Sequence, residues 1–491
     1  MDQLTQVPRF DQQNIGLTEA EISAKSSARV SRWIWLALVI PCVWAITTAN
    51  PSLTTFAIVL LPVLAKLVWR RGEPPLLMFM CGMQWLQASA AIFYANFYHA
   101  SLTQAFGGTE LERATWLSLI GVLALAVGMR VALFRAAPIR EDLQQQDADS
   151  YSIGLIYGAY MLVFAVSYIA TGLATRVPAL AQFFFAVTNI KWTLMFMLLY
   201  SVSVQQRGYA FAAAGVAIEV LSGVLGYFAG FKGVFFLLLI VSLSSAAALR
   251  GRKLLTICAV GVALLTSGLI WTAVKSDYRE FLTQGLRSQE VLVPVEDRVG
   301  KLQDLIADFQ WGQIGDAAEA LILRVSYVQY FALTMINVPA NMPYENGALW
   351  LGAVKHVVTP RLLFPNKGTL DDSERASLYT GLTVAGSEQG TSIGIGYMAE
   401  SYVDFGPVFM FGPIVLLGAF YGLIYRLFVT KSRCRLVGCG IATAICVFGG
   451  NAVETSNVKL LGGNVTALVV LTAFYFVFGP RLQSWFGRAD E

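Results

Sequence analysis

One short segment gathers cations on a restrained backbone. In the run TPRLLFPNK, Arg361 lies between two prolines, and Lys367 follows them. Prolines limit the conformations of this segment, and an arginine can hold a phosphate through two parallel hydrogen bonds. The pattern predicts an anion site, although the same side chains would also serve to neutralise nearby acids or lipid headgroups. The basic group around this segment comprises Lys355, His356, Arg361, Lys367 and Arg375.

Two carboxylates follow a run rich in glycine and hydroxyl side chains. Glu400 and Asp404 are four residues apart, so on a helix they would share one face. Such a pair can supply a general base. Asp404 directly precedes an apolar run, and the favoured interpretation is that it caps that helix and complements its dipole. Glu400 has no such explanation and is the candidate base, with His356 in reserve.

Isolated charges also interrupt apolar runs. Lys191 and Glu219 lie near the middle of two of these runs, and each costs about 2.5–3.5 kcal/mol at the centre of a bilayer. They would meet at similar depth, either as a structural ion pair or as a headgroup site or proton relay. Lys232, between two glycines in AGFKGVFF, either reaches to the interface or contacts a lipid phosphate. Arg324 lies in a further apolar stretch.

The composition defines the elements that must position these residues. Of 491 residues, 56% are hydrophobic and 13% are charged, and the mean hydropathy is +0.60. Soluble domains are about 45–50% apolar and about 25% charged. A soluble enzyme is therefore excluded, and the fold class is an all-α polytopic membrane protein. The net charge of +4 gives no basic excess for a nucleic-acid partner.

Twelve apolar runs approach the roughly 20 residues that a helix needs to cross a bilayer. This predicts about 12 transmembrane helices, bounded by tails and interrupted by one long loop. The predicted spans are 33–48, 52–69, 75–98, 114–133, 152–171, 180–203, 209–229, 233–248, 254–274, 406–426, 435–450 and 463–479. The predicted regions are a 1–32 tail, spans one to nine in 33–274, a loop at 275–403, spans ten to twelve in 404–480, and a 481–491 tail.

Charge sets the predicted orientation. Arginine and lysine gather in alternate connections, as in the cluster Lys431, Arg433 and Arg435, which favours both ends in the cytoplasm. The apolar stretch 320–338 would reverse this order if it crossed, so it is predicted to lie in the outer interface or against the bundle. The 275–403 loop then faces outward. It holds 10 Lys and Arg against 15 Asp and Glu, which gives −5, and its apolar pattern predicts a folded cap.

No metal or cofactor is expected. The six cysteines show no zinc spacing and no disulfide framework. With two histidines, a histidine-rich metal site is excluded. No phosphate-binding loop or dinucleotide fingerprint is present.

Two motifs together resemble those of the Wzy-type polymerases of bacterial O-antigen and exopolysaccharide. The first is a proline–arginine–hydrophobic–proline–lysine segment, and the second is a glutamate–x–tyrosine–x–x–phenylalanine–glycine segment that opens a span. The matching residues are Pro360, Arg361, Pro365 and Lys367, then Glu400, Tyr402, Phe405 and Gly406. The sequence departs from the family after Lys367, where relatives often have an aromatic residue and a second proline, and at Asp404, where asparagine is common.

The resemblance implies a glycosyltransferase of the GT-C class in the bacterial inner membrane. Such enzymes move a growing glycan from undecaprenyl diphosphate to the next lipid-linked repeat unit at the periplasmic face. A flippase and a chain-length regulator are the implied protein partners. Arg361 would stabilise the diphosphate leaving group, with Lys232, Arg324, Lys367 and Arg375 as further anion ligands. Glu400 would be the base.

Two other functions remain open from the sequence. A ligase that moves finished polymer to another acceptor would share the fold, the donor and the cations. A polysaccharide flippase or secondary transporter would also explain twelve spans, and Lys191 with Glu219 is the best support for it. No repeat between the two halves is visible, and a transporter does not need so long an outward loop.

Overall fold

The computed structural model describes most of the chain after residue 37. The described residues are 38–137, 139, 141–227, 230–244, 251–286, 291–309, 312, 314–361, 363–364, 366–368, 370–386, 391–449 and 453–487. Within these ranges the regular structure is helical and no strand occurs. The predicted tail 1–32, the start of the first span, Pro365 and residues 488–491 lie outside the described residues.

Eight helices are long and apolar enough to cross a membrane. The chain is therefore a helical membrane protein. Seven of these helices are α3 (Pro51–Val68), α4 (Leu76–Phe97), α6 (Glu110–Ala132), α8 (Ile153–Arg176), α13 (Arg252–Thr283), α20 (Phe411–Tyr425) and α22 (Asn457–Phe486). The eighth is broken near Asn189 into α9 (Ala181–Thr188) and α10 (Ile190–Gln205).

The other four predicted spans fall on shorter helices. These are α2 (Val39–Ile46), α11 (Tyr209–Val224), α12 (Lys232–Leu243) and α21 (Arg435–Phe448). Two long helices exceed their predictions: α13 continues nine residues beyond 274, and α22 begins six residues before 463. The additional turns matter because those of α13 carry Lys275 and Arg279 and those of α22 carry Asn457 and Lys459, which belong to the charged site described below.

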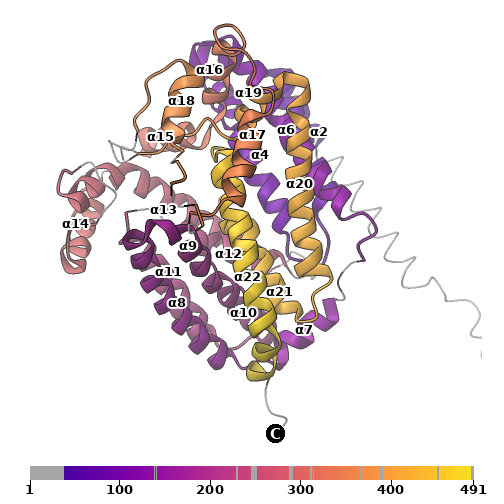
Figure 1. The fold of residues 1–491 in the computed structure, drawn as a ribbon, viewed down its shortest axis with the longest axis vertical. Helices are drawn as coiled ribbons and strands as arrows, with labels where there is room; N and C mark the ends of the chain where they lie inside the picture. Colours follow the sequence, from indigo (N-terminus) through magenta and orange to yellow (C-terminus); the bar gives the residue numbers. More distant parts are fainter. Residues whose placement is uncertain are drawn as a thin grey trace, which may run out of the picture.

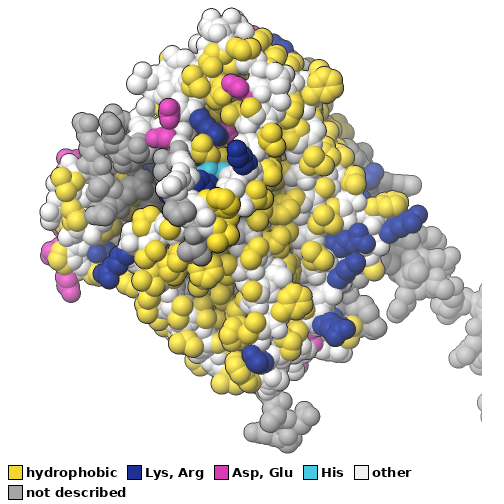
Figure 2. Space-filling view, in the orientation of Figure 1, with side chains coloured by type: hydrophobic (Ala, Val, Ile, Leu, Met, Phe, Trp, Pro, Cys, Tyr) yellow, Lys and Arg dark blue, Asp and Glu magenta, His cyan; other side chains and the backbone are white. Residues whose placement is uncertain are grey.

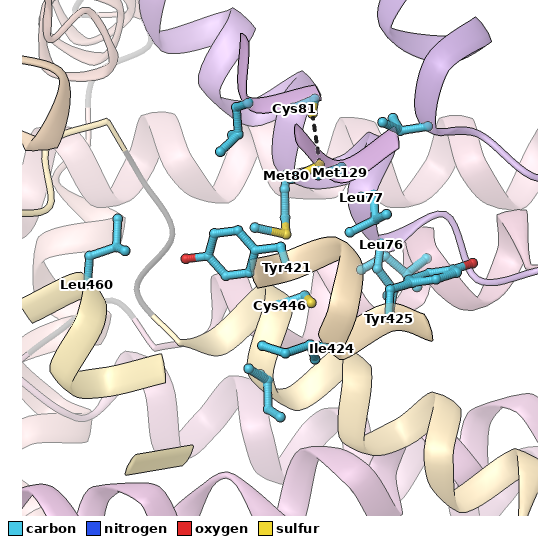
Figure 3. Close-up of a cluster of buried hydrophobic side chains, with 14 of the residues drawn as sticks. Leu76, Leu77, Met80, Cys81, Met129, Tyr421, Ile424, Tyr425, Cys446 and Leu460 are labelled. Carbon is cyan, nitrogen blue, oxygen red and sulfur yellow. Dashed lines mark hydrogen bonds between the residues drawn. The ribbon is translucent and has the colours of Figure 1, made fainter. Parts of the chain in front are cut away.

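The bundle core is built by close helix contact. Glycines at the α6–α20 crossing let the two backbones touch: a Cβ on Gly418 would overlap the Leu125 carbonyl oxygen, and one on Gly128 would overlap that of Val415. Small residues of this kind are the usual route to close packing between membrane helices. Beside this crossing, Tyr421 of α20 lies fully buried among side chains of α4, α21 and α22 (Figure 3).

A cap of shorter helices covers one end of the bundle (Figure 1). Its helices are α15 (Ile314–Val325), α16 (Val328–Asn337), α17 (Ala348–Val358), α18 (Asp372–Thr380) and α19 (Tyr397–Phe409). A further helix, α14 (Val295–Ala307), projects to one side. The remaining short helices are α5 (Leu102–Phe106) and α7 (Glu141–Ser150), the latter near the C-terminal end of the bundle.

The apolar stretch 320–338 does not form one continuous helix. It breaks at Ser326 and Tyr327, which divide α15 from α16. On α16, Phe331 and Met335 are buried in the main core. Neither helix is among the candidate spans, so the expected alternative of packing against the bundle describes α16.

Candidate functional site

Helix α19 carries both predicted carboxylates. Glu400 and Asp404 lie one helical turn apart, as their spacing predicts, and each residue is only 1% exposed. The helix ends its regular course at Gly406, which has φ +69° and precedes Pro407. Because glycine reaches positive φ without steric cost, the chain turns here and enters α20. Both carboxylates therefore belong to the cap rather than to the spanning helix.

Asp404 caps a different helix from the one predicted. Its two carboxylate oxygens accept hydrogen bonds from the backbone nitrogens of Leu349, at 2.9 Å, and Trp350, at 2.8 Å. These are among the free N–H groups of the first turn of α17, where a negative charge is favoured. The sequence prediction that Asp404 caps the tenth span is wrong because α19 is already helical at that residue.

Glu400 faces the N-terminus of α22. Its Oε2 accepts a hydrogen bond from the Asn457 nitrogen at 2.7 Å, and its Oε1 lies 3.6 Å from the Arg375 guanidinium. Burial raises the pKa of Glu400 to about 7, while the Asn457 hydrogen bond and Arg375 act in the opposite direction. A carboxylate with a pKa near neutrality is suited to accept a proton. In this conformation, however, it is closed off from solvent.

The predicted anion segment lies beside the end of α17. Lys367 donates from its Nζ to the carbonyl oxygen of Thr359, at 2.9 Å, and to that of His356. Lys367 therefore caps the C-terminus of α17, which favours a cation. Burial lowers the pKa of His356, and the nearby charges of Lys367, Arg361 and Arg375 lower it further. We call these four residues the His356 group; Figure 2 shows Lys and Arg side chains beside a histidine on this face.

A second set of cations gathers around Lys232. Lys232 begins α12 and lies within electrostatic range of Arg324, on α15, of the carboxylate Glu454, and of Arg279. Lys275 is within range of all three. We call Lys232, Lys275, Arg279 and Arg324 the four-cation group. None of the four has a carboxylate within ion-pairing distance in the described parts of the chain.

Lys275 and Arg279 were missed by sequence analysis. The ninth span was predicted to end at 274, which left both residues at the start of a long loop. In the structure they lie one turn apart on the last three turns of α13. Their i, i+4 spacing directly after an apolar run could have indicated that the helix continues and carries both cations on one face. Arg279 also donates to the Tyr227 carbonyl oxygen at 3.2 Å and lies over that ring.

A few acidic and phenolic side chains connect the two cationic groups. Tyr327 lies within electrostatic range of Arg324, Glu454 and Asp372. Asp372 in turn pairs with Lys459 at 2.8 Å and is close to Glu400. The seven predicted site residues Lys232, Arg324, His356, Arg361, Lys367, Arg375 and Glu400 thus belong to one charged network at the cap end of the bundle.

Lys191 and Glu219 lie apart from this network. Lys191 Nζ is 2.7 Å from Glu219 Oε2, so the pair meets as its depth predicted. Tyr160 donates to the other carboxylate oxygen at 2.9 Å. The ammonium also lies 4.6 Å from the Trp192 ring centroid. Both carboxylate oxygens of Glu219 thereby have a partner within the bundle. This is the arrangement expected of a structural ion pair that holds two helices together.

Fold and site together define a polytopic helical membrane protein with a buried acid and two cationic groups at its capped end. Residues 79–452 match the family described as "Domain of unknown function (DUF8712)". Because this match covers most of the chain, the protein belongs to that family. No curated protein and no solved structure matches the chain.

Proposed function

We propose that the protein is a glycosyltransferase that joins lipid-diphosphate-linked oligosaccharide repeat units. The observation that carries this proposal is the four-cation group, whose like charges lie close together; Glu454 is in electrostatic range of Lys232, and no carboxylate ion pair is formed within the described residues. Four cations are only partly compensated by one nearby carboxylate, and a bound anion would relieve their repulsion, because like charges repel more strongly where they are partly buried. A polyprenyl diphosphate offers a compact, multiply charged partner together with tails that suit the apolar bundle.

The proposed reaction is transfer of a glycan between two lipid carriers. The bond between the anomeric carbon of the donor sugar and the diphosphate oxygen breaks, and the lipid diphosphate leaves with the bonding electrons. The acceptor hydroxyl oxygen forms the new glycosidic bond, and its proton passes to a base. Cations held in place before the reaction stabilise the developing charge of the leaving group. Arg361 and Arg324 are the proposed principal ligands.

Glu400 and His356 are the candidate bases, as the sequence suggested. For Glu400 to reach the acceptor sugar, Arg375 must move away. The 3.6 Å between the Arg375 nitrogen and the Glu400 oxygen is too long for a good hydrogen bond within this ion pair. His356 is part-exposed, and burial together with the nearby cations lowers its pKa, which favours the neutral form that a base requires. The role of Lys367 shifts in this proposal from diphosphate ligand to support of α17.

The sequence resemblance to Wzy-type polymerases supports the same proposal. It brings with it the finer expectations of twelve spans, a GT-C fold, both ends in the cytoplasm and a bacterial inner membrane. Arg361, Glu400 and Gly406 are the motif residues on which the resemblance depends most. The association of Arg361 and Glu400 with one charged network supports a shared role for these two residues.

Arginine substitutions test this proposal in cells that depend on the protein for surface polymer. Arg361→Ala and Arg324→Ala should each abolish the polymer ladder while the protein still accumulates in the membrane. Arg176→Ala is the matched control: Arg176 is an exposed cation at the end of α8, outside the network, and the ladder should remain. A normal ladder in both arginine variants would remove the four-cation and His356 groups from the mechanism.

A further inference from the structure

Helix α14 has an apolar side and a charged side. Leu302 and Leu305 pack against the small core formed by Phe231, Trp271 and Tyr278. The residues on the opposite side are charged and exposed, including Asp297 and Asp304. On the apolar side, next to Leu302, lies an apolar stripe that no described part of the chain covers. It consists of Val295, Val299 and Ile306, which are 49%, 39% and 46% exposed.

The apolar stripe follows helical geometry. Its residues are spaced by four and seven positions, so at 3.6 residues per turn they fall within one narrow sector of the helix. An apolar stripe of this kind normally packs against other protein or against lipid. In a water-exposed cap it would face solvent at a cost, whereas in the region where a bilayer meets water it would insert into the acyl boundary while the charged face stays hydrated.

The position of α14 is fixed by α13. That helix has 32 residues, or about 48 Å at 1.5 Å per residue, and therefore exceeds a hydrocarbon core of about 30 Å. Its first turns present exposed leucines to the surroundings, among them Leu255. Counted from the exposed Leu254, the roughly 20 residues that cross a bilayer place the far edge of the hydrocarbon core near residue 274, between Trp271 and Tyr278, which are both buried against α14. Because α14 packs on this aromatic pair, it lies at that level.

Exposed leucines also occur among the described residues between the two helices. Leu286 and Leu292, on either side of 287–290, are 60% and 42% exposed. They add exposed apolar side chains near the end of α13 and near the start of α14. We propose that α14 lies in the headgroup region of the bilayer where α13 leaves it, with Val295, Val299 and Ile306 inserted at the acyl boundary. The inference concerns a lipid surface and is independent of the proposed glycosyl transfer.

Fluorescence quenching in vesicles tests this placement. A bimane label is attached to Val299→Cys or Ile306→Cys in the full-length chain, with the exposed Cys258 and part-exposed Cys42 replaced by serine. Asp304→Cys, on the opposite face, is the matched control. The vesicles contain phosphatidylcholine and phosphatidylglycerol, with and without doxyl-labelled lipid, and aqueous iodide is the second quencher. A label at 304 should be quenched by iodide, whereas a label at 299 or 306 should lose most of that quenching and respond to doxyl lipid.

Two results would overturn the proposal. Equal iodide quenching at 299, 306 and 304 would place the stripe in water. Protection of 299 and 306 from both iodide and doxyl lipid would mean that protein covers the stripe, as in contact with a second copy. Two labelling positions keep the test informative if one substitution disturbs folding.

Discussion

At the scale of single residues, the buried carboxylate of Glu400 experiences opposing effects. Burial disfavours its charged form, whereas the Asn457 nitrogen at the start of α22 and the Arg375 guanidinium favour it. Burial is the larger effect, so the pKa rises from 4.5 to about 7. The folded protein therefore binds a proton more tightly at Glu400 than the unfolded chain does.

This shift predicts a pH-dependent stability. Because the folded pKa is raised, the contribution of Glu400 to stability is fully present below about pH 4.5 and is lost as the pH rises through about 7. Glu400→Gln should abolish this loss, so that the variant gains stability over wild type by several degrees between pH 5 and pH 8. Thermal unfolding of both proteins in detergent at the two pH values provides the measurement. Parallel curves at both pH values would contradict it.

The ion pair of Lys191 and Glu219 predicts a contrast between single and double substitutions. Lys191→Met alone leaves a buried carboxylate without its cation and should destabilise the protein by about 3–5 kcal/mol. Replacing both residues, by Met and Leu, removes the two charges together and should be tolerated. Accumulation and thermal stability of the three proteins measure this. If the double variant accumulates normally but loses function, the pair has a role beyond structure.

Sequence reasoning succeeded for residues whose partners could be inferred from depth or helical spacing. Lys191 with Glu219 and the shared helix of Glu400 and Asp404 are examples. It failed where the partner comes from a distant segment. Nothing in the local sequence around Asp404 indicates that its oxygens reach the first turn of α17, because that contact depends on how the cap folds.

At the scale of elements, α17 is secured at both ends by charge. Asp404 accepts from its first turn, and Lys367 donates to carbonyls at its last turn. These contacts complement both ends of the helix dipole. The helix carries His356 in its last turn and leads directly to Arg361. Lys367 was predicted to bind substrate. Its observed contacts instead hold the end of the helix that carries His356.

The crossing of α6 and α20 predicts a position-specific effect of added side chains. Gly418→Val would drive methyl groups into the Leu125 carbonyl and should sharply reduce folded protein. Gly412→Val on the same helix is the control, since nothing lies within 4 Å of a Cβ there. Size-exclusion profiles and protein levels in membranes measure both. Equal losses of folded protein from the two variants would show that any added valine on α20 destabilises the protein, whether or not it lies at the α6–α20 crossing.

Sequence patterns predicted the existence of the long helices better than their ends. Hydropathy marks where a helix is apolar, and α13 and α22 continue as regular helices beyond the apolar part. This is why Lys275 and Arg279 were assigned to a loop. The break between α15 and α16 was also missed, because an apolar run gives no local sign that tertiary packing will divide it.

At the scale of the whole molecule, apolar and charged residues are segregated. The helical bundle presents large apolar side chains over much of its surface (Figure 2), while the acids and cations of the candidate site gather near the cap. Composition alone predicted a membrane protein, and the eight long apolar helices confirm this. The predicted count of twelve and the orientation stay predictions, since hydropathy and charge bias are their support.

The most direct test of the proposed function is the glycan profile of cells lacking the gene. Lipid-linked and surface glycans are separated by gel before and after deletion, and again after the gene is restored. The proposal predicts that the polymer ladder disappears, that a single repeat unit remains on its final carrier, and that the restored gene returns the ladder. Full-length polymer stranded on undecaprenyl diphosphate would indicate a ligase, and repeat units held on the cytoplasmic leaflet a flippase. An unchanged glycan profile would contradict the proposal outright.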